Sequence, residues 1–294
     1  MDVADLKILA AVARHGSMNK AAAELNTVQS NVTARIKALE DDIGVPLFHR
    51  HSRGVTPSAA CERLLPYASR IAHLLKEAGE AARDDGIPSG LLRIGTLETT
   101  AALRLPGFLA DYARAFPRVA LTVIAGTTAA LIDDVLEFRL DGAFVAGPVR
   151  HADLTEKTIF REEMVLLTPP TVVGWDDLGS LRNLRTIVFR RGCSYRQHLE
   201  TLLMERGLPT AEPLEFGSID AIIGCVGAGV GITLLPRGVA AEAIRQGRVA
   251  AHPLPEEYAV VDTVFIRRRD CHVSSAMEAF LRIVYPAPER MAAE

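Results

Sequence analysis

The stretch SMNKAAAELNTVQSNVTARIKALE, residues 17–40, decides how the N-terminal part of the chain is interpreted. Ser17 is a good helix N-cap, and small apolar side chains follow it at helical spacing. Asn26 interrupts this run, and Thr27 can cap a second helix. One apolar stripe runs along that second helix and consists of Val28, Val32, Ile36, Leu39 and Ile43. The pattern predicts two short helices joined by a tight turn.

The face of the second helix that lies opposite the stripe is polar and carries little charge near its start. Gln and Asn can pair with base edges, Ser and Thr can donate or accept, and Ala allows close approach to a base. We therefore predict that this helix lies in a major groove of double-stranded DNA. The DNA-binding residues predicted on it are Thr27, Gln29, Ser30, Asn31, Thr33, Ala34, Arg35 and Lys37. An ordinary amphipathic helix with a solvated face would show the same pattern.

Residues 45–55, VPLFHRHSRGV, contain two apolar anchors followed by a basic turn that a glycine closes. This order predicts a short hairpin, or wing. Arg50 and Arg53 stand in its turn, where they can reach phosphates or a minor groove.

The segments AAAELN, QSNVTARIKALE and GVPLFHRHSRGVT together resemble the winged helix-turn-helix of the LysR-type transcriptional regulators. The matching positions are Gln29, Ser30, Thr33, Leu39, Glu40, Leu47, Phe48 and Arg50. One departure is PSAAC at residues 57–61, where the family usually has a leucine-threonine-proline-alanine-glycine run. Ser58 can still cap the helix that follows.

Composition limits the classes of protein that the chain can be. With 294 residues, 49% hydrophobic and 23% charged, it can form two or three compact units. It has 33 Lys and Arg against 36 Asp and Glu, so a DNA-binding surface must be a local patch. The four cysteines lack metal-ligand or CxxC spacing, which predicts reduced thiols, no metal site and no cofactor. No apolar run could span a bilayer, so we expect a cytoplasmic protein with no membrane partner.

A long helix is predicted over residues 58–82, with Pro66 inside it. Its apolar and small residues alternate at spacings of three and four, which is typical of a coiled-coil seam. We predict that the helix forms a homodimer, and the alternative is that the seam packs on its own chain. The predicted dimer contacts are Leu64, Ala68, Ile71, Leu75 and Ala78.

Residues 84–90, DDGIPSG, read as a hinge, and the pattern beyond it changes to short strands alternating with helices. Strands are predicted at residues 91–96, 119–125 and 143–146, with helices at 100–116 and 127–140 between them. This order implies a parallel sheet with helices on both faces. A second set follows, with strands predicted at residues 164–168, 185–189, 214–216 and 232–235 and helices at 195–206 and 219–227. A returning strand at 258–267 and a closing helix at 274–285 complete the pattern.

This second part resembles the LysR-type effector domain, which is similar to type-II periplasmic binding proteins. The matching residues are Arg93, Ile94 and Gly95, then Asp141 to Phe144, then Gly229 to Ile232 with Leu235 and Pro236. The predicted fold class is α/β, with an N-terminal all-α winged helix-turn-helix and a long linker helix followed by two α/β lobes. The predicted domains are residues 1–58, 59–90 and 91–294, with lobes at 91–161 plus 266–294 and at 162–265. The resemblance also implies a homotetramer built by the C-terminal lobes, and RNA polymerase as a partner.

Ligands of open α/β sheets bind beyond the carboxyl ends of strands, near the starts of helices. Hydroxyl groups and paired arginines in such loops favour a small anionic effector. The predicted effector-binding residues are Thr96, Glu98, Thr99, Thr100, Thr127, Thr128, Arg190, Arg191, Ser194 and Ser218. By resemblance, Thr99 and Thr100 match the place where the family often holds the carboxylate of an effector. Each hydroxyl could instead cap a helix, and Glu98 could hold an amine or repel an acid.

Three other functions are compatible with parts of the sequence. Cys193 lies near Tyr195 and His198 in sequence, and this group could supply the nucleophile and base of a cysteine-dependent enzyme. No motif fixes the geometry of these residues. Cys193 and Cys225 could form a thiol-based redox sensor, although they are distant in sequence. A transport binding protein of the same fold would need a signal peptide. We therefore predict a transcriptional regulator controlled by a small molecule, and not an enzyme.

Overall fold

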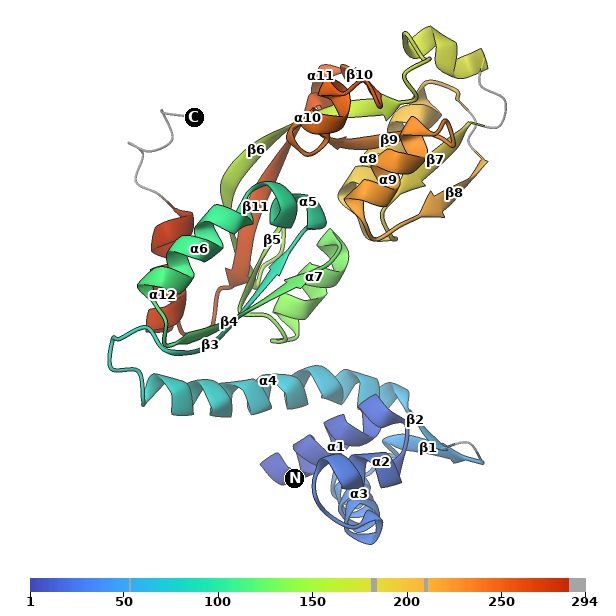
Figure 1. The fold of residues 1–294 in the computed structure, drawn as a ribbon. Coiled ribbons are helices and arrows are strands. Elements are labelled where there is room, and N and C mark those ends of the chain that lie inside the picture. The colour runs from blue at the N-terminus through green and yellow to red at the C-terminus, as the bar shows by residue number, and fades with distance from the viewer. Residues whose placement is uncertain (53, 181–183, 209–210, 286–294) are drawn as a thin grey trace. The chain divides into compact units, whose positions relative to one another are not determined.

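The computed structural model describes residues 1–52, 54–180, 184–208 and 211–285. Arg53, one of the predicted DNA-binding residues, lies outside them. The chain forms two compact units, Met1–Asp84 and Asp85–Glu294 (Figure 1).

The first unit is a winged helix-turn-helix followed by a long helix. Its elements are α1 (Val3–His15), α2 (Met18–Glu24), α3 (Gln29–Ile43), β1 (Phe48–His51), β2 (Gly54–Pro57) and α4 (Ala59–Ala81). The predicted caps are confirmed at Ser17, whose side chain accepts from the Lys20 N–H, and at Ser58, whose side chain accepts from the Cys61 N–H. The predicted wing is an antiparallel hairpin, and Glu40 of α3 holds its start by accepting from the backbone N–H groups of Leu47 and Phe48.

Helix α3 departs from the predicted pattern at both ends. Val32, Ile36 and Leu39 are buried in the core of the first unit, but Val28 is 64% exposed and Ile43 is 39% exposed. The helix begins at Gln29 with Val28 at its N-cap, so Thr27 does not cap it. The Thr27 hydroxyl instead accepts from the side-chain amide of Asn31 at 3.0 Å. The helix is therefore anchored through its middle turns, and its first turn stands out from the domain.

The second unit is built on a mixed sheet whose strand order is β10-β6-β11-β5-β3-β4, with β9 also paired to β6. The strands of this sheet are β3 (Gly90–Thr96), β4 (Val119–Ala125), β5 (Gly142–Ala146), β6 (Leu154–Thr168), β9 (Thr233–Pro236), β10 (Ala250–His252) and β11 (Val260–Arg268). The predicted parallel pairing is confirmed for β3 with β4 and β5. The direction of the returning strand was not predicted, and β11 runs antiparallel to both β5 and β6.

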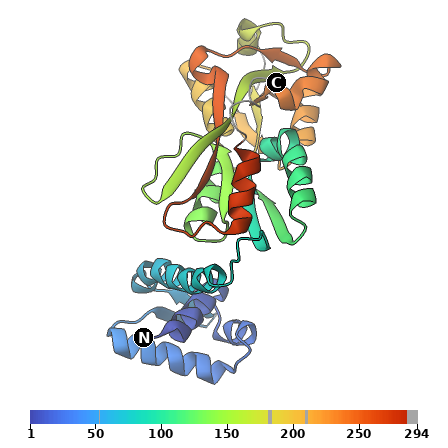
Figure 2. The ribbon, with the colours of Figure 1, turned by 90° about the vertical axis from the view of Figure 1, so that its left-hand side faces the viewer.

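Helices cover both faces of this sheet. The first half contains α5 (Glu98–Leu103), α6 (Leu105–Ala115) and α7 (Thr128–Leu136), and the chain returns to it with α12 (Ser275–Val284). Helices α6 and α12 lie together on one face, and α7 covers the other (Figures 1 and 2). Under α6 and α12, the rings of Phe144 and Phe265 meet edge to face with centroids 5.0 Å apart.

The other half of the second unit surrounds a separate parallel pair of strands. It contains η1 (Trp175–Ser180), β7 (Arg185–Val188), α8 (Ser194–Glu205), β8 (Ala211–Glu215), α9 (Ile219–Gly227), α10 (Arg237–Arg245) and α11 (Glu256–Ala259). Strands β6 and β11 run through both halves (Figure 1). One buried cluster joins α7 and β5 to β7, α8 and α9, so the two α/β lobes share a core.

Candidate DNA-binding surface and effector cavity

The polar face of α3 is open to solvent. Gln29, Ser30, Asn31, Ala34 and Lys37 are exposed, whereas Thr33 is partly buried. The Gln29 amide lies 3.4 Å from the Thr33 hydroxyl, one turn away on the same face. Arg50 is exposed on the wing. A row of neutral donors and acceptors with a small residue between them is suited to reading base edges, and the wing cation is suited to a phosphate.

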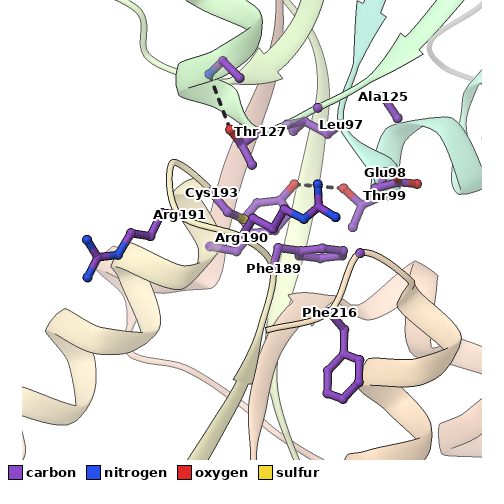
Figure 3. A pocket seen from close by; sticks show the side chains of 14 residues that line it. Leu97, Glu98, Thr99, Ala125, Thr127, Phe189, Arg190, Arg191, Cys193 and Phe216 are labelled. Atoms are coloured by element: carbon purple, nitrogen blue, oxygen red, sulfur yellow. Dashed lines mark hydrogen bonds between the residues drawn. The ribbon is translucent and has the colours of Figure 1, made fainter. Parts of the chain in front are cut away.

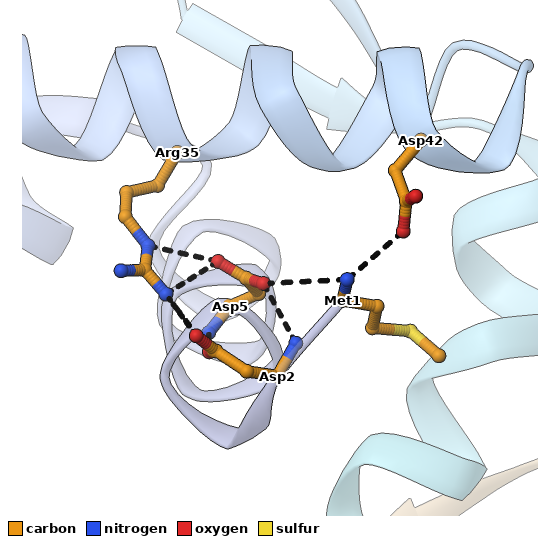
Figure 4. A network of polar contacts seen from close by, with 5 residues as sticks. All are labelled: Met1, Asp2, Asp5, Arg35 and Asp42. Atoms are coloured by element: carbon orange, nitrogen blue, oxygen red, sulfur yellow. Dashed lines mark hydrogen bonds and ion pairs between the residues drawn. The ribbon is translucent and has the colours of Figure 1, made fainter.

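Arg35 was predicted to contact DNA, but the structure gives it a different role. Its Nε donates to Asp5 at 2.8 Å, and its Nη2 donates to both carboxylate oxygens of Asp2 at 2.8 and 2.9 Å (Figure 4). These hydrogen bonds raise the pKa of the Arg35 guanidinium. Because both acids belong to the start of α1, Arg35 holds α3 against α1, and its guanidinium is engaged there.

Helix α4 carries two adjacent stripes of apolar residues, one facing the core of the first unit and one facing outward. The sequence pattern predicted a single seam in their place. Cys61 and Ala68 are buried in the core of the first unit, so these members of the predicted seam pack on their own chain. Leu64 and Ile71 are partly buried against the same core. At about 100° per residue, Leu74 lies beside Tyr67 on the outer stripe, with Leu75 at its margin. Tyr67 is 66% exposed, Leu74 is 47% exposed and Leu75 is 51% exposed. Ala78 is also exposed.

A cavity of about 480 Å³ lies in the second unit, where four strands end. The residues lining it follow β3, β4, β7 and β8, which is the edge where open α/β sheets bind ligands. Its size is within the range of small-molecule sites. The lining residues are Leu97, Glu98, Thr99, Ala125, Gly126, Thr127, Ala130, Phe189, Arg190, Arg191, Cys193, Tyr195, Phe216 and Gly217.

The cavity includes part of the predicted effector-binding set, namely Glu98, Thr99, Thr127, Arg190 and Arg191. Arg190 extends toward Thr99, whereas the side chain of Arg191 points away (Figure 3). Thr127 caps α7, and its hydroxyl accepts from the Ala130 N–H at 3.4 Å.

Other predicted effector residues lie elsewhere. Thr96 is fully buried, with its hydroxyl donating to the Leu97 carbonyl, and Thr100 is buried without lining the cavity. Thr128 and Ser194 line a different cavity of about 400 Å³. Ser218 lines a third, of about 570 Å³, which shares Glu98 and Gly217 with the first.

Sequence reasoning missed the apolar walls of the 480 Å³ cavity, which are Leu97, Phe189 and Phe216. Phe189 and Phe216 read as the last residues of strands. Their position at carboxyl ends was the signal that could have identified them, because that edge of the sheet is where ligands bind.

Two contacts join the lobes at the cavity. The hydroxyls of Thr99 and Tyr195 lie 3.4 Å apart (Figure 3). The Ala129 N–H donates to the Gly192 carbonyl at 3.2 Å. Burial raises the pKa of Tyr195 to about 12, so its hydroxyl is a neutral donor at physiological pH. A ligand in the cavity would contact both lobes and could change how they are held together.

The cysteine and the histidine suggested for cysteine-dependent catalysis line different cavities. Cys193 lines the 480 Å³ cavity, whereas His198 lines the 400 Å³ cavity. Burial raises the pKa of the Cys193 thiol, an effect that the N–H groups of Arg196 and Tyr195 offset only in part. Burial also lowers the pKa of His198. A protonated thiol and an imidazole in a separate cavity are not the activated pair that such catalysis requires.

The fold and its two sites define a class of protein: a winged helix-turn-helix regulator with a two-lobed, ligand-binding α/β domain. A family model described as "LysR substrate binding domain" matches residues 85–287, and one described as "Bacterial regulatory helix-turn-helix protein, lysR family" matches residues 3–62. The chain belongs to the LysR family of bacterial transcriptional regulators.

Similar proteins cover nearly the whole chain. The transcriptional regulator GltR of Bacillus subtilis (strain 168) is 43% identical over 281 residues, which is 96% of this chain and 95% of the relative. The regulator CzcR of Bacillus cereus is 39% identical over 284 residues, or 97% of each chain.

Among solved structures, full-length OxyR from Pseudomonas aeruginosa gives a TM-score of 0.69 at 21% identity, covering 97% of this chain and 94% of its own. Full-length CbnR complexed with its target DNA gives a TM-score of 0.62 at 25% identity, covering 97% of this chain and 99% of its own. In the described part of the chain, every helix is too short or too polar to cross a bilayer.

Proposed function

We propose that this LysR-family regulator binds a small metabolite with an anionic group in the 480 Å³ cavity and that this ligand changes how the protein holds DNA. The observation that carries the proposal is the combination of an arginine with three hydroxyls at the ends of strands. Arg190 can pair with a carboxylate, and Thr99, Thr127 and Tyr195 can donate to it.

The proposal assigns DNA reading to α3 and phosphate contact to the wing. Gln29, Ser30, Asn31 and Ala34 form the exposed first turns of α3, and Arg50 stands on the wing. The outer stripe of α4, with Tyr67, Leu74 and Leu75, provides the contact for a homodimer. Two copies would hold two recognition helices for two half-sites. A ligand that binds one arrangement of the lobes more tightly than another shifts the equilibrium between these arrangements. The shift equals the difference between its two binding free energies, typically about 1–3 kcal/mol.

Replacing Arg190 with glutamine is expected to abolish the response to the effector while leaving DNA binding in its absence unchanged. The full-length protein is titrated onto DNA selected by the wild type from a random pool, with a metabolite panel present or absent. Arg191→Gln is the matched control, because that side chain points away from the cavity (Figure 3). If a metabolite alters DNA binding by the wild type and Arg190→Gln equally, the effector does not bind at Arg190.

A thiol-based sensor is the second candidate, because Cys193 lines the same cavity. Its raised pKa keeps the thiol protonated at neutral pH, and only 6% of the residue is exposed. Iodoacetamide is therefore expected to modify Cys193 at least about tenfold more slowly than the partly exposed Cys225, as read by mass spectrometry of the native protein. Raising the pH should accelerate Cys193 only well into the alkaline range. Modification of Cys193 before Cys225 at pH 7 would favour the redox sensor.

A further inference from the structure

We infer that the effector carries an ammonium group as well as a carboxylate, as an amino acid does, with the ammonium held by Glu98 and the carboxylate by Arg190. This inference rests on the proposed function, because it names the ligand class of the same cavity. Glu98 begins α5 in one lobe, and Arg190 follows β7 in the other. Both line the 480 Å³ cavity.

Both charged groups are available to a ligand. Within the described residues, neither the Glu98 carboxylate nor the Arg190 guanidinium makes a hydrogen bond or an ion pair. Other charged side chains of the same lobes are paired, as Arg104 is with Glu162 at 2.9 Å and Arg196 with Glu200 at 2.7 Å. Two opposite charges that border one cavity without protein partners match a ligand that has both charges.

The charge of the cleft changes sign along its length. The adjoining 570 Å³ cavity shares Glu98 and Gly217 with the first, and the charged residues that line it are Glu98 and Asp220. The positive charge of the first cavity comes from Arg190, which extends toward Thr99 (Figure 3). A simple acid bound at Arg190 would share the cavity with the like charge of Glu98, whereas a dipolar ligand has a favourable partner at each end. The apolar walls lie along the same cavity and can contact a hydrocarbon side chain.

Glu98 also has a purely structural interpretation. It is an acidic residue in the first turn of α5, where it interacts favourably with the helix dipole. That role predicts that Glu98→Gln slightly lowers the melting temperature and leaves ligand selectivity unchanged. Selectivity between ligands with and without an ammonium group therefore separates the two roles.

The experiment uses the full-length protein and matched probes. The twenty L-amino acids are screened by thermal shift together with the 2-oxo acid and the N-acetyl derivative of each, and the binders are titrated by calorimetry. At least one amino acid is expected to bind, with its two derivatives weaker by at least about tenfold, since a hydrogen-bonded ionic contact is lost. Glu98→Gln should reduce that ratio to about twofold or less, and Arg190→Gln should weaken the amino acid and its derivatives alike.

The outcomes separate this inference from the proposed function. If the 2-oxo or N-acetyl acids bind the wild type as tightly as the amino acids do, and Arg190→Gln weakens them, the cavity binds a simple acid and the inference is wrong. The inference is also wrong if Glu98→Gln retains the full discrimination. If none of these probes binds, the inference is wrong, while the proposed function still stands or falls with the metabolite panel. If a probe binds and Arg190→Gln leaves its affinity unchanged, both the ligand class and the assignment of the cavity are wrong.

Discussion

Leu75→Asp is expected to convert a dimer into monomers and to weaken binding to selected DNA by about 100-fold or more. Leu75 is 51% exposed at the margin of the outer stripe of α4, about 80° around the helix from Tyr67. In a dimer of these helices, the substitution places two carboxylates in an apolar contact, where their desolvation is unfavourable. A monomer binds one half-site at a time, so it loses the gain in effective concentration that a linked second site provides. Sedimentation velocity measures the mass, and fluorescence anisotropy measures the DNA affinity.

Lys76→Asp is the control for this change. Lys76 is the next residue of α4, on the opposite side of the helix from Tyr67 and Leu74 at about 100° per residue, and it pairs with Glu80 at 3.4 Å. Such exposed pairs contribute little, so this variant should remain dimeric. If Leu75→Asp sediments with the mass of the wild type, another surface joins the subunits, and the assignment of the outer stripe is wrong.

Gln29→Ala is expected to cost about 1–3 kcal/mol on the selected site and to relax base preference at one position of each half-site. The reason is that the exposed Gln29 amide, in the first turn of α3, can make two hydrogen bonds to one base edge. Arg50→Ala on the wing should instead weaken binding to selected and scrambled DNA alike. It should also reduce the slope of the logarithm of the binding constant against the logarithm of the salt concentration by about one, because one phosphate contact is lost.

Matched substitutions on the second unit control for general effects on the protein. Gln246→Ala and Arg114→Ala remove the same side-chain types from exposed positions of α10's C-cap and α6. Neither should change DNA affinity or salt dependence. A Gln29→Ala protein with unaltered affinity and unaltered base preference would show that α3 does not read the sequence through this residue.

Much of the fold could be predicted from the sequence because apolar periodicity and caps were clear. Strand β4 (Val119–Ala125) and helix α9 (Ile219–Gly227) have the predicted bounds. Strand β6 was predicted only from residue 164, whereas it begins at Leu154. The first half of β6 is largely exposed and polar, so it lacked the apolar signature of a buried strand. The antiparallel return of β11 is a long-range pairing, and local patterns do not encode it.

The functional sites were predictable to different degrees. Exposure of the first turns of α3 followed from its apolar stripe, but the acids that pair with Arg35 lie in another helix, about thirty positions away in sequence. On α4, residues facing the chain's own core and residues facing outward are both apolar, so spacing alone did not separate Ala68 from Leu74. Hydroxyls near helix starts were found, but which of them faced a cavity depended on packing between the lobes.

Coupling between the cavity and DNA is the central claim, and one pair of affinities tests it most directly. The dissociation constant for selected DNA is measured with and without a saturating ligand that requires Arg190. The dissociation constant for that ligand is then measured with and without DNA. We predict that both change by the same factor, between about 5 and 150, because linkage requires reciprocity. A ligand that binds at Arg190 while leaving the DNA affinity unchanged would contradict the account.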